Sequence, residues 1–358
     1  HSLPGLGQSV LRRLLATRCA ETVLQQDVAG WRDAGLTASQ AHTLAHARDR
    51  GRCPDAGFDI ERALDTLGNL DVRVIELAHP DYPPLLSAIP DPPPLLYLRG
   101  RVEIIGSPQV AMVGSRRASP AGKRIAAALA AELAGCGMVV TSGLASGIDG
   151  AAHRGAVDGG GNTVAVMATG IDRIYPQRHR VLAEQLVEQG LLLTEFAPGT
   201  PPHRGHFPRR NRIISGLALA TVVVEAALPS GSLLTATAAA EQGRDVCAVP
   251  WSSLHPGGAG CLKLLHEGAA LVRDATDVMD SLGWFGSVPA RRRQQGTALP
   301  ASLAAPARQL YGELGVEPVS LEQLLRDTGF EPGALQGLLT QLELEGLVTR
   351  SADGIVRA

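Results

Sequence analysis

The stretch MVVTSGLASGIDGAAH, residues 138–153, decides the fold. It begins with an apolar run, which predicts a buried strand. The small residues between Thr141 and Gly147 predict a tight turn, and residues 148–153 are compatible with the start of a helix. The backbone N–H groups of such a turn can approach an anion closely, and the helix N-terminus adds a favourable dipole. The stretch therefore predicts a strand, a turn and a helix that together cradle a phosphate.

The same alternation of strand and helix extends on both sides of this stretch. Strands are predicted at residues 110–113, 138–141, 163–167, 191–194, 221–225 and 246–249, with helices at 121–134, 148–157, 178–188, 233–242 and 261–266. Apolar strands that alternate with helices predict a parallel, doubly wound sheet. The predicted fold class is therefore α/β, with an extended Rossmann-like parallel sheet.

Two smaller domains are predicted to flank this sheet. Residues 1–70 predict a helical domain, and the sequence LPGLG near its start is typical of a helix-hairpin-helix turn. Residues 71–282 form the Rossmann-like domain, whose proline-rich start is expected to be an extended arm that docks the helical domain. Residues 283–300 predict a linker, and residues 301–358 fit a winged helix with three helices and a short hairpin.

Composition limits the possible functions. Apolar residues make up 45% of the chain, which predicts a folded core, while the net charge of −2 gives no overall nucleic-acid signal, so any anion site is local. Five scattered cysteines without CxxC spacing predict neither a disulfide framework nor a zinc site, and no metal or cofactor is expected. No membrane-spanning stretch or secretory signal is found, which predicts a cytoplasmic protein without membrane contact.

Three predicted strand ends carry similar turns of small, hydroxyl-bearing residues that open a helix. Candidate anion-binding residues are Gly114, Ser115, Arg116 and Arg117 in the first turn, Ser142, Gly143, Ser146 and Gly147 in the second, and Gly231 and Ser232 in the third. In an open α/β sheet, ligands bind beyond the carboxyl ends of the strands, so the three turns predict one shared site. None of them matches GxGxxG or GxxxxGK[ST], which argues against a dinucleotide or P-loop site.

A basic cluster, HRGHFPRRNR, lies at residues 203–212 between the fourth and fifth predicted strands. Its candidate ligand-binding residues are Arg209, Arg210, Asn211 and Arg212. Arginine forks bind phosphate bidentately, and an asparagine can pair with a base edge. Phe207 is either a base-stacking residue or a core residue. Several phosphate cradles beside a strip of arginines favour a polyanion over a single nucleotide.

The motifs between residues 82 and 272 resemble those of the DprA/Smf family of bacterial DNA-processing proteins. They are YPPLL, VGSRRAS, SGLASGIDGAAHRGA, TGIDRIYP, FPRRNRIISGL, VVVEA, SGSLLTA and EQGRDVCAVP. The resemblance implies sequence-independent binding of single-stranded DNA, protection of that strand and loading of the RecA recombinase onto it during natural transformation. It also implies a homodimer without catalytic activity. By motif position, it implies DNA contacts from the three turns and from Arg210, Asn211 and Arg212.

The chain departs from the family pattern at four positions. Ser146 stands where the family usually has a basic residue, His179 and Leu262 stand where it has asparagine, and Trp251 replaces a glycine. Because Ser146 carries no charge, we expect Arg116 and the Arg210–Arg212 cluster to provide more of the grip on DNA.

Two other interpretations stay open at the level of sequence. One is a nucleotide-processing enzyme similar to the phosphoribohydrolases, which carry a PGGxGTxxE signature. The corresponding turn, Pro229 to Thr235, lacks that glutamate, and Glu225 is the remaining candidate base. The other is a scaffold in which the turns are structural. The winged-helix segment has 4 arginines and 8 acidic residues, so it is expected to contact protein rather than duplex DNA.

Overall fold

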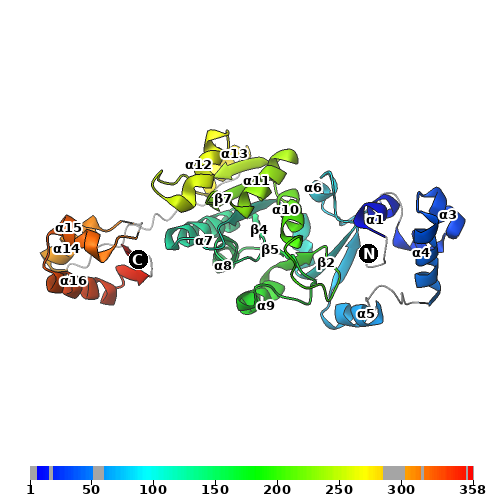
Figure 1. The fold of residues 1–358 in the computed structure, drawn as a ribbon, viewed down its shortest axis with the longest axis horizontal. Helices are drawn as coiled ribbons and strands as arrows, with labels where there is room; N and C mark the ends of the chain where they lie inside the picture. Colours follow the sequence, from blue (N-terminus) through cyan, green and yellow to red (C-terminus); the bar gives the residue numbers. More distant parts are fainter. Residues whose placement is uncertain are drawn as a thin grey trace. The chain divides into compact units, whose positions relative to one another are not determined.

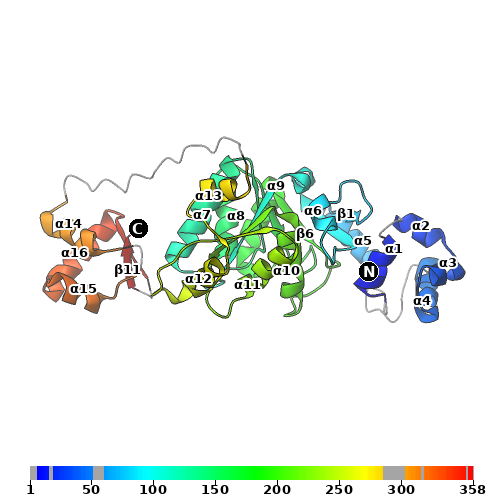
Figure 2. The same cartoon turned by 90° about the horizontal axis from the view of Figure 1, so that it is seen from above.

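The structure is a computed structural model that divides into two compact units, His1–Pro289 and Ala290–Ala358 (Figures 1 and 2). It describes residues 6–15, 19–50, 60–284, 303–315, 318–351 and 354–357. Most of the LPGLG turn, and the predicted linker from residue 285 on, lie outside these described residues. Among the helices described, none has both the length and the apolar character needed to cross a membrane.

Within the described residues, the first unit is built on a nine-stranded sheet with the order β1-β2-β6-β5-β4-β3-β7-β8-β9. The strands are β1 (Arg73–Glu76), β2 (Leu95–Gly100), β3 (Gln109–Gly114), β4 (Val139–Ser142), β5 (Thr163–Val166), β6 (Leu191–Thr194), β7 (Ala220–Glu225), β8 (Asp245–Ala248) and β9 (Ala270–Leu271). From β6 to β9 the neighbours are parallel, as predicted. The strands β1 and β2 extend the β6 edge with antiparallel pairing.

Helices cover both faces of this sheet. They are α7 (Pro120–Gly135), α8 (Ile148–Asp158), α9 (Arg180–Gln189), α10 (His206–Leu217), α11 (Gly231–Glu241), α12 (Ala259–His266) and α13 (Ala275–Ser281). Figure 2 shows α7, α8 and α13 on one side of the sheet and α10, α11 and α12 on the other. An apolar core lies between the sheet and each of these helix layers. Along β3, Val110 and Met112 pack against the layer with α7, α8 and α13, and Ala111 and Val113 pack against the layer with α10, α11 and α12. A strand buried on both faces is the reason for its continuous apolar run.

The proline-rich arm differs from the extended chain that was expected. It contributes strand β2 and a short helix, α6 (Pro84–Ser87), which begins at a proline. The expectation of an extended arm is wrong for Pro84–Ser87, because the first turn of a helix needs no N–H donor from its first residue. The arm packs against α10, where a Cβ on Gly216 would lie 2.9 Å from the Leu86 side chain.

Four N-terminal helices pack around a buried tryptophan, namely α1 (Gln8–Leu15), α2 (Ala20–Gln25), α3 (Val28–Asp33) and α4 (Ala38–Arg50). Trp31 is fully buried, and its indole N–H donates to the carbonyl oxygen of Val23 at 2.6 Å. Leu14 and Leu15 of α1 join the same apolar cluster. The fifth helix, α5 (Ile60–Asn69), packs its Leu67 against a different apolar cluster that includes Tyr97 of β2.

The second unit has the predicted winged-helix order of elements. These are α14 (Ala305–Glu313), α15 (Leu321–Thr328), α16 (Pro332–Leu344), and the antiparallel strands β10 (Val348–Ser351) and β11 (Gly354–Arg357). Ser320 caps α15, because its hydroxyl oxygen accepts from the backbone N–H of Gln323 at 3.2 Å.

Candidate nucleic-acid interface

The carboxyl edge of the sheet carries a cavity of about 680 Å³. Its lining includes Gly114, Ser115, Arg116 and Arg117 from the turn after β3, Ala145 and Asp149 from the turn after β4, and Pro229, Ser230, Gly231 and Ser232 from the turn after β7. Arg204, Phe207, Arg210 and Asn211 line it from the start of α10. Three turns far apart in the sequence therefore meet at one cavity.

A second cavity of about 230 Å³ adjoins the first. The two share Arg116, Arg117, Ala145, Tyr175 and Phe207, and the second adds Gly143, Ser146 and Arg178. We call the two cavities together the groove. Of the residues predicted from the sequence, Ser142, Gly147, Arg209 and Arg212 lie outside its lining, and the others line it.

The groove carries several arginines that form no ion pair with an acidic side chain among the residues that the structure describes. Arg116, Arg117 and Arg204 are exposed and belong to this set, although the charge of Arg116 acts to lower the pKa of Asp149 in the same cavity. The guanidinium of Arg116 lies 4.6 Å from the ring centroid of Phe207, and that ring packs at 5.8 Å against Tyr175. The groove thus places cations beside two aromatic rings, of which Tyr175 is 46% exposed.

Arg178 supplies a charge beside Ser146. Its guanidinium donates a hydrogen bond to the Ser146 hydroxyl, and both side chains line the second cavity. The position where the family usually has a basic residue therefore receives its positive charge from a different segment. The expected loss of charge at this point of the groove is compensated.

Arg210 lines the groove from below, because its side chain is almost entirely buried. It is 4% exposed, and its guanidinium donates to the backbone carbonyl oxygens of Gly143 and Val166. A Cβ on Gly143 would lie 2.3 Å from this guanidinium, so a larger residue there would displace the Arg210 side chain. Burial lowers the pKa of Arg210 to about 10, so the side chain stays charged at neutral pH. Arg210 thus ties the second turn to β5, and its direct contact with DNA stays a prediction.

The carboxylate of Asp149 balances this buried cation and fills the second turn. Its Oδ2 accepts from the backbone N–H groups of Gly143 at 3.2 Å and Ala145 at 3.3 Å. Burial raises the pKa of Asp149, and the positive charge of Arg210 opposes the rise. The backbone N–H groups of this turn, which were expected to bind a phosphate, thus donate to a carboxylate of the protein itself.

The other two turns also satisfy part of their own donors. Glu225, which is 2% exposed, accepts from the backbone N–H and hydroxyl group of Ser119 at the start of α7. In the third turn, the hydroxyl oxygen of Ser230 accepts from the N–H of Ser232 at 3.3 Å. The backbone N–H groups of Arg116 and Gly231 have no acceptor among the described residues. The three cradles therefore offer fewer N–H donors than expected, and side-chain cations dominate the groove.

Ser142 and Gly147 hold the turns together. The Ser142 hydroxyl donates to the carbonyl oxygen of Met112 at 2.6 Å and ties β4 to β3. Gly147 has a φ of 80°, and a Cβ there would lie 2.1 Å from the carbonyl oxygen of Ser115. Both residues shape the groove from behind its surface.

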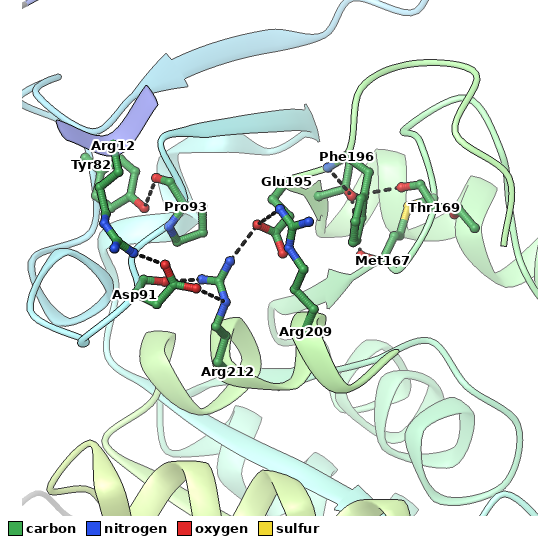
Figure 3. A network of polar contacts seen from close by, with 11 residues as sticks. Arg12, Tyr82, Asp91, Pro93, Met167, Thr169, Glu195, Phe196, Arg209 and Arg212 are labelled. Atoms are coloured by element: carbon green, nitrogen blue, oxygen red, sulfur yellow. Dashed lines mark hydrogen bonds and ion pairs between the residues drawn. The ribbon is translucent and has the colours of Figure 1, made fainter. Parts of the chain in front are cut away.

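Arg209 and Arg212 point away from the groove, toward Glu195, which directly follows β6 (Figure 3). Burial raises the pKa of Glu195, and the two guanidinium groups oppose the rise. These two arginines of the basic cluster thus share one buried carboxylate, with the Arg212 side chain 13% exposed and the Arg209 side chain 36% exposed.

Two further departures from the family pattern, Trp251 and His179, make contacts inside the protein. Trp251 donates its indole N–H to the carbonyl oxygen of Val224 at 2.7 Å, and its ring stacks on His255 with centroids 4.4 Å apart. His179 is buried, with Nδ1 2.9 Å from the carbonyl oxygen of Leu144.

Sequence analysis missed Tyr175 and Arg178 as groove residues. Both belong to the segment that follows β5, a strand whose carboxyl end lies at the same edge of the sheet as the three turns. The rule that ligands bind beyond these ends could have included this segment. The segment was passed over because it is not a small-residue turn that opens directly into a helix.

The fold and the groove define a Rossmann-like α/β protein joined to a winged-helix unit. Residues 73–283 match the family described as DNA recombination-mediator protein A, and residues 294–354 match the DprA winged helix domain. The chain is 38% identical to Protein Smf of Escherichia coli (strain K12) over 307 residues, which is 83% of this chain and 80% of that protein. The chain belongs to the DprA/Smf family.

Two solved structures resemble this one. The X-ray structure of DNA processing protein A from Streptococcus pneumoniae superposes with a TM-score of 0.66 at 35% identity, covering 77% of this chain and 93% of that chain. DNA processing protein A from Helicobacter pylori, described for its single-stranded DNA binding mode, gives a TM-score of 0.55 at 28% identity, covering 61% and 98%.

Proposed function

We propose that this chain binds single-stranded DNA in the groove, without sequence specificity and without catalysis. The observation that carries the proposal is the set of groove arginines, Arg116, Arg117, Arg178 and Arg204, that form no ion pair with a carboxylate among the described residues. Family membership and the H. pylori relative, described for its single-stranded DNA binding mode, support the same ligand.

The chemistry of the groove favours a strand over a duplex. Guanidinium groups bind phosphate oxygens through charge-assisted hydrogen bonds, whatever base follows. Phe207 and Tyr175 offer rings on which a base can stack, and only an unpaired strand exposes the faces of its bases. Groove arginines and aromatic rings together therefore bind a single strand with little regard to its sequence.

By membership of the DprA/Smf family, we extend the proposal to the cellular role. The protein acts as a homodimer in the cytoplasm, protects incoming single-stranded DNA and loads the RecA recombinase onto it during natural transformation. This extension rests on the family relationship and not on the groove.

A non-catalytic role agrees with the surroundings of Glu225. A phosphoribohydrolase-like enzyme needs an available carboxylate, but Glu225 is buried and accepts three hydrogen bonds from Ser119. If the protein released free base from nucleoside monophosphates, the proposal would be wrong and the phosphoribohydrolase-like enzyme would be the better description.

The direct test is the affinity for a fluorescent oligo-dT strand, measured by anisotropy with an unlabelled duplex of equal length as competitor. We expect Arg116→Met to weaken strand binding by about tenfold, since one charge-assisted phosphate contact contributes on that order. Arg180→Met is the matched control, because Arg180 is exposed on α9 and pairs with Glu184. Equal affinity of wild type and Arg116→Met for the strand refutes the proposed site.

A further inference from the structure

Helix α10 presents two functional faces. Phe207 and Asn211 line the groove, whereas Arg209 and Arg212 contact Glu195 (Figure 3). The position of the groove wall therefore depends on what anchors the opposite face of the helix.

Glu195 is this anchor. Its carboxylate is fully buried, and Oε2 accepts from Nη2 of Arg212 at 2.6 Å and from Nη2 of Arg209 at 3.1 Å. A buried carboxylate between two guanidinium groups has a narrow range of acceptable geometry, because any displacement leaves an uncompensated charge in the interior. Glu195 thus fixes both the rotation and the depth of α10 against the sheet.

The same arginine links this anchor to the proline-rich arm. The guanidinium of Arg212 donates to the backbone carbonyl of Asp91, and its Nε lies 3.4 Å from the Asp91 carboxylate. The arm itself is held by the Tyr82 hydroxyl, which donates to the carbonyl oxygen of Pro93 at 2.7 Å. Asp91 is therefore held in place on one side by α10, and its carboxylate can bind a second group on the other side.

The N-terminal helices provide that second contact. Arg12 of α1 forms an ion pair with the carboxylate of Asp91 (Figure 3). The next residue along the helix, Arg13, instead donates to the carbonyl oxygen of Gly35 at 2.7 Å, within the helical domain. A continuous chain of charges therefore runs from α1 to the helix that walls the groove.

We propose that Glu195 is a positioning residue for the groove and that the N-terminal helices brace it through Arg12, Asp91 and Arg212. The inference rests on the proposed function for its DNA readout. It gives the helical domain a part in strand binding without any contact between that domain and DNA.

The sign of the effect separates positioning from simple electrostatics. Replacing an acidic residue by its amide makes the protein more positive, so electrostatics alone strengthens DNA binding. Loss of a positioning contact weakens it. We expect Glu195→Gln to weaken oligo-dT binding about tenfold, because its ion pairs are buried. We expect Asp91→Asn to weaken it about threefold, because the Asp91 side chain is half-exposed and its ion pairs are weaker.

Asp81→Asn is the matched control for Asp91→Asn. Asp81 lies in the same arm, forms an ion pair with Arg73 at 2.5 Å, and is 55% exposed against 53% for Asp91. In the same way, Arg13→Met controls for Arg12→Met, because both remove one charge from α1. We expect unchanged or slightly tighter binding in Asp81→Asn, and a larger loss of affinity in Arg12→Met than in Arg13→Met.

A second measurement tests the brace without DNA. Hydrogen exchange of the α10 amides in the full chain is expected to speed up at least threefold in Asp91→Asn and to stay at the wild-type rate in Asp81→Asn. It also covers the case in which Glu195→Gln does not fold. Wild-type exchange rates in Asp91→Asn, with affinity equal to or tighter than wild type, overturn the proposal. Faster exchange in a protein whose wild type binds no strand supports the brace while refuting the proposed function.

Discussion

Two arginine-rich segments of this protein look alike in sequence and differ in what their charges do. In the turn after β3, Arg116 and Arg117 are exposed and form no ion pair with a carboxylate among the described residues. In α10, Arg209 and Arg212 both pair with the single carboxylate of Glu195, and Arg210 is buried near Asp149. The difference shows that the charge available to a ligand depends on acidic residues contributed by distant segments.

The largest expected effect is on protein stability and tests the buried arginine, Arg210. Arg210→Met should lower the free energy of unfolding by about 3–5 kcal/mol, because it leaves the Asp149 carboxylate buried without its cation. Urea denaturation measures this. Arg117→Met, which removes an exposed charge, should change the same free energy by less than about 0.5 kcal/mol. Equal stability of the two variants would mean that Arg210 is not structural.

A smaller effect is expected from the aromatic part of the groove. Phe207→Ala should weaken oligo-dT binding by about tenfold, since a stacked base contributes about 1–3 kcal/mol. The slope of log K against log salt should stay at its wild-type value, because no charge is removed. A changed slope would show that Phe207 acts by placing Arg116 over its ring rather than by stacking a base.

The contrast between interior and groove also predicts a pH dependence. The Thr163 hydroxyl donates to Val140, so His153 Nδ1 must donate to Thr163. Burial lowers the pKa of His153 to about 3, so His153 stays neutral in the folded protein while the unfolded chain takes up a proton below pH 6.5. The contribution of neutral His153 to the free energy of unfolding is complete above pH 6.5 and is lost as the pH falls toward 3.

Between pH 6.5 and 5.5, this residue alone should lower the free energy of unfolding by about 1 kcal/mol. Urea denaturation at the two pH values should therefore show a drop about 1 kcal/mol smaller in His153→Asn than in wild type. The same drop in both proteins would contradict a neutral, buried His153.

The smallest effect concerns the charge beside Ser146. Arg178→Met should weaken oligo-dT binding about threefold and lower the salt slope by about 0.7, the value for one phosphate contact on a single strand. Adding Ser146→Lys to this variant should restore both quantities, because the lysine places a cation in the same cavity. If the lysine restores neither quantity, Arg178 does not replace the missing basic residue.

Much of the fold could be predicted because apolar periodicity is a local property. The central strands, their helices and the winged helix follow from it, and the strand-end rule brings the three turns to one edge. Helix α10 was missed because its first half is basic, while its buried residues, Ile213, Ile214 and Leu217, lie in the second half.

The available charge could not be predicted in the same way. Whether an arginine faces solvent or a carboxylate is decided by contacts across the sheet, such as those of Glu195 with Arg209 and Arg212. Asp149 and Glu225 gave no signal in the sequence that they would fill the turns themselves. The groove was thus predictable in its place and not in its chemistry.

The salt dependence of strand binding tests the account most directly. Four groove arginines that each bind one phosphate predict a slope of log K against log salt of about −2.8 for wild type, and a loss of affinity of roughly 50-fold between 50 and 200 mM. The double variant Arg116→Met with Arg117→Met should have a slope of about −1.4. A double variant that keeps the wild-type slope would show that the phosphates are held elsewhere.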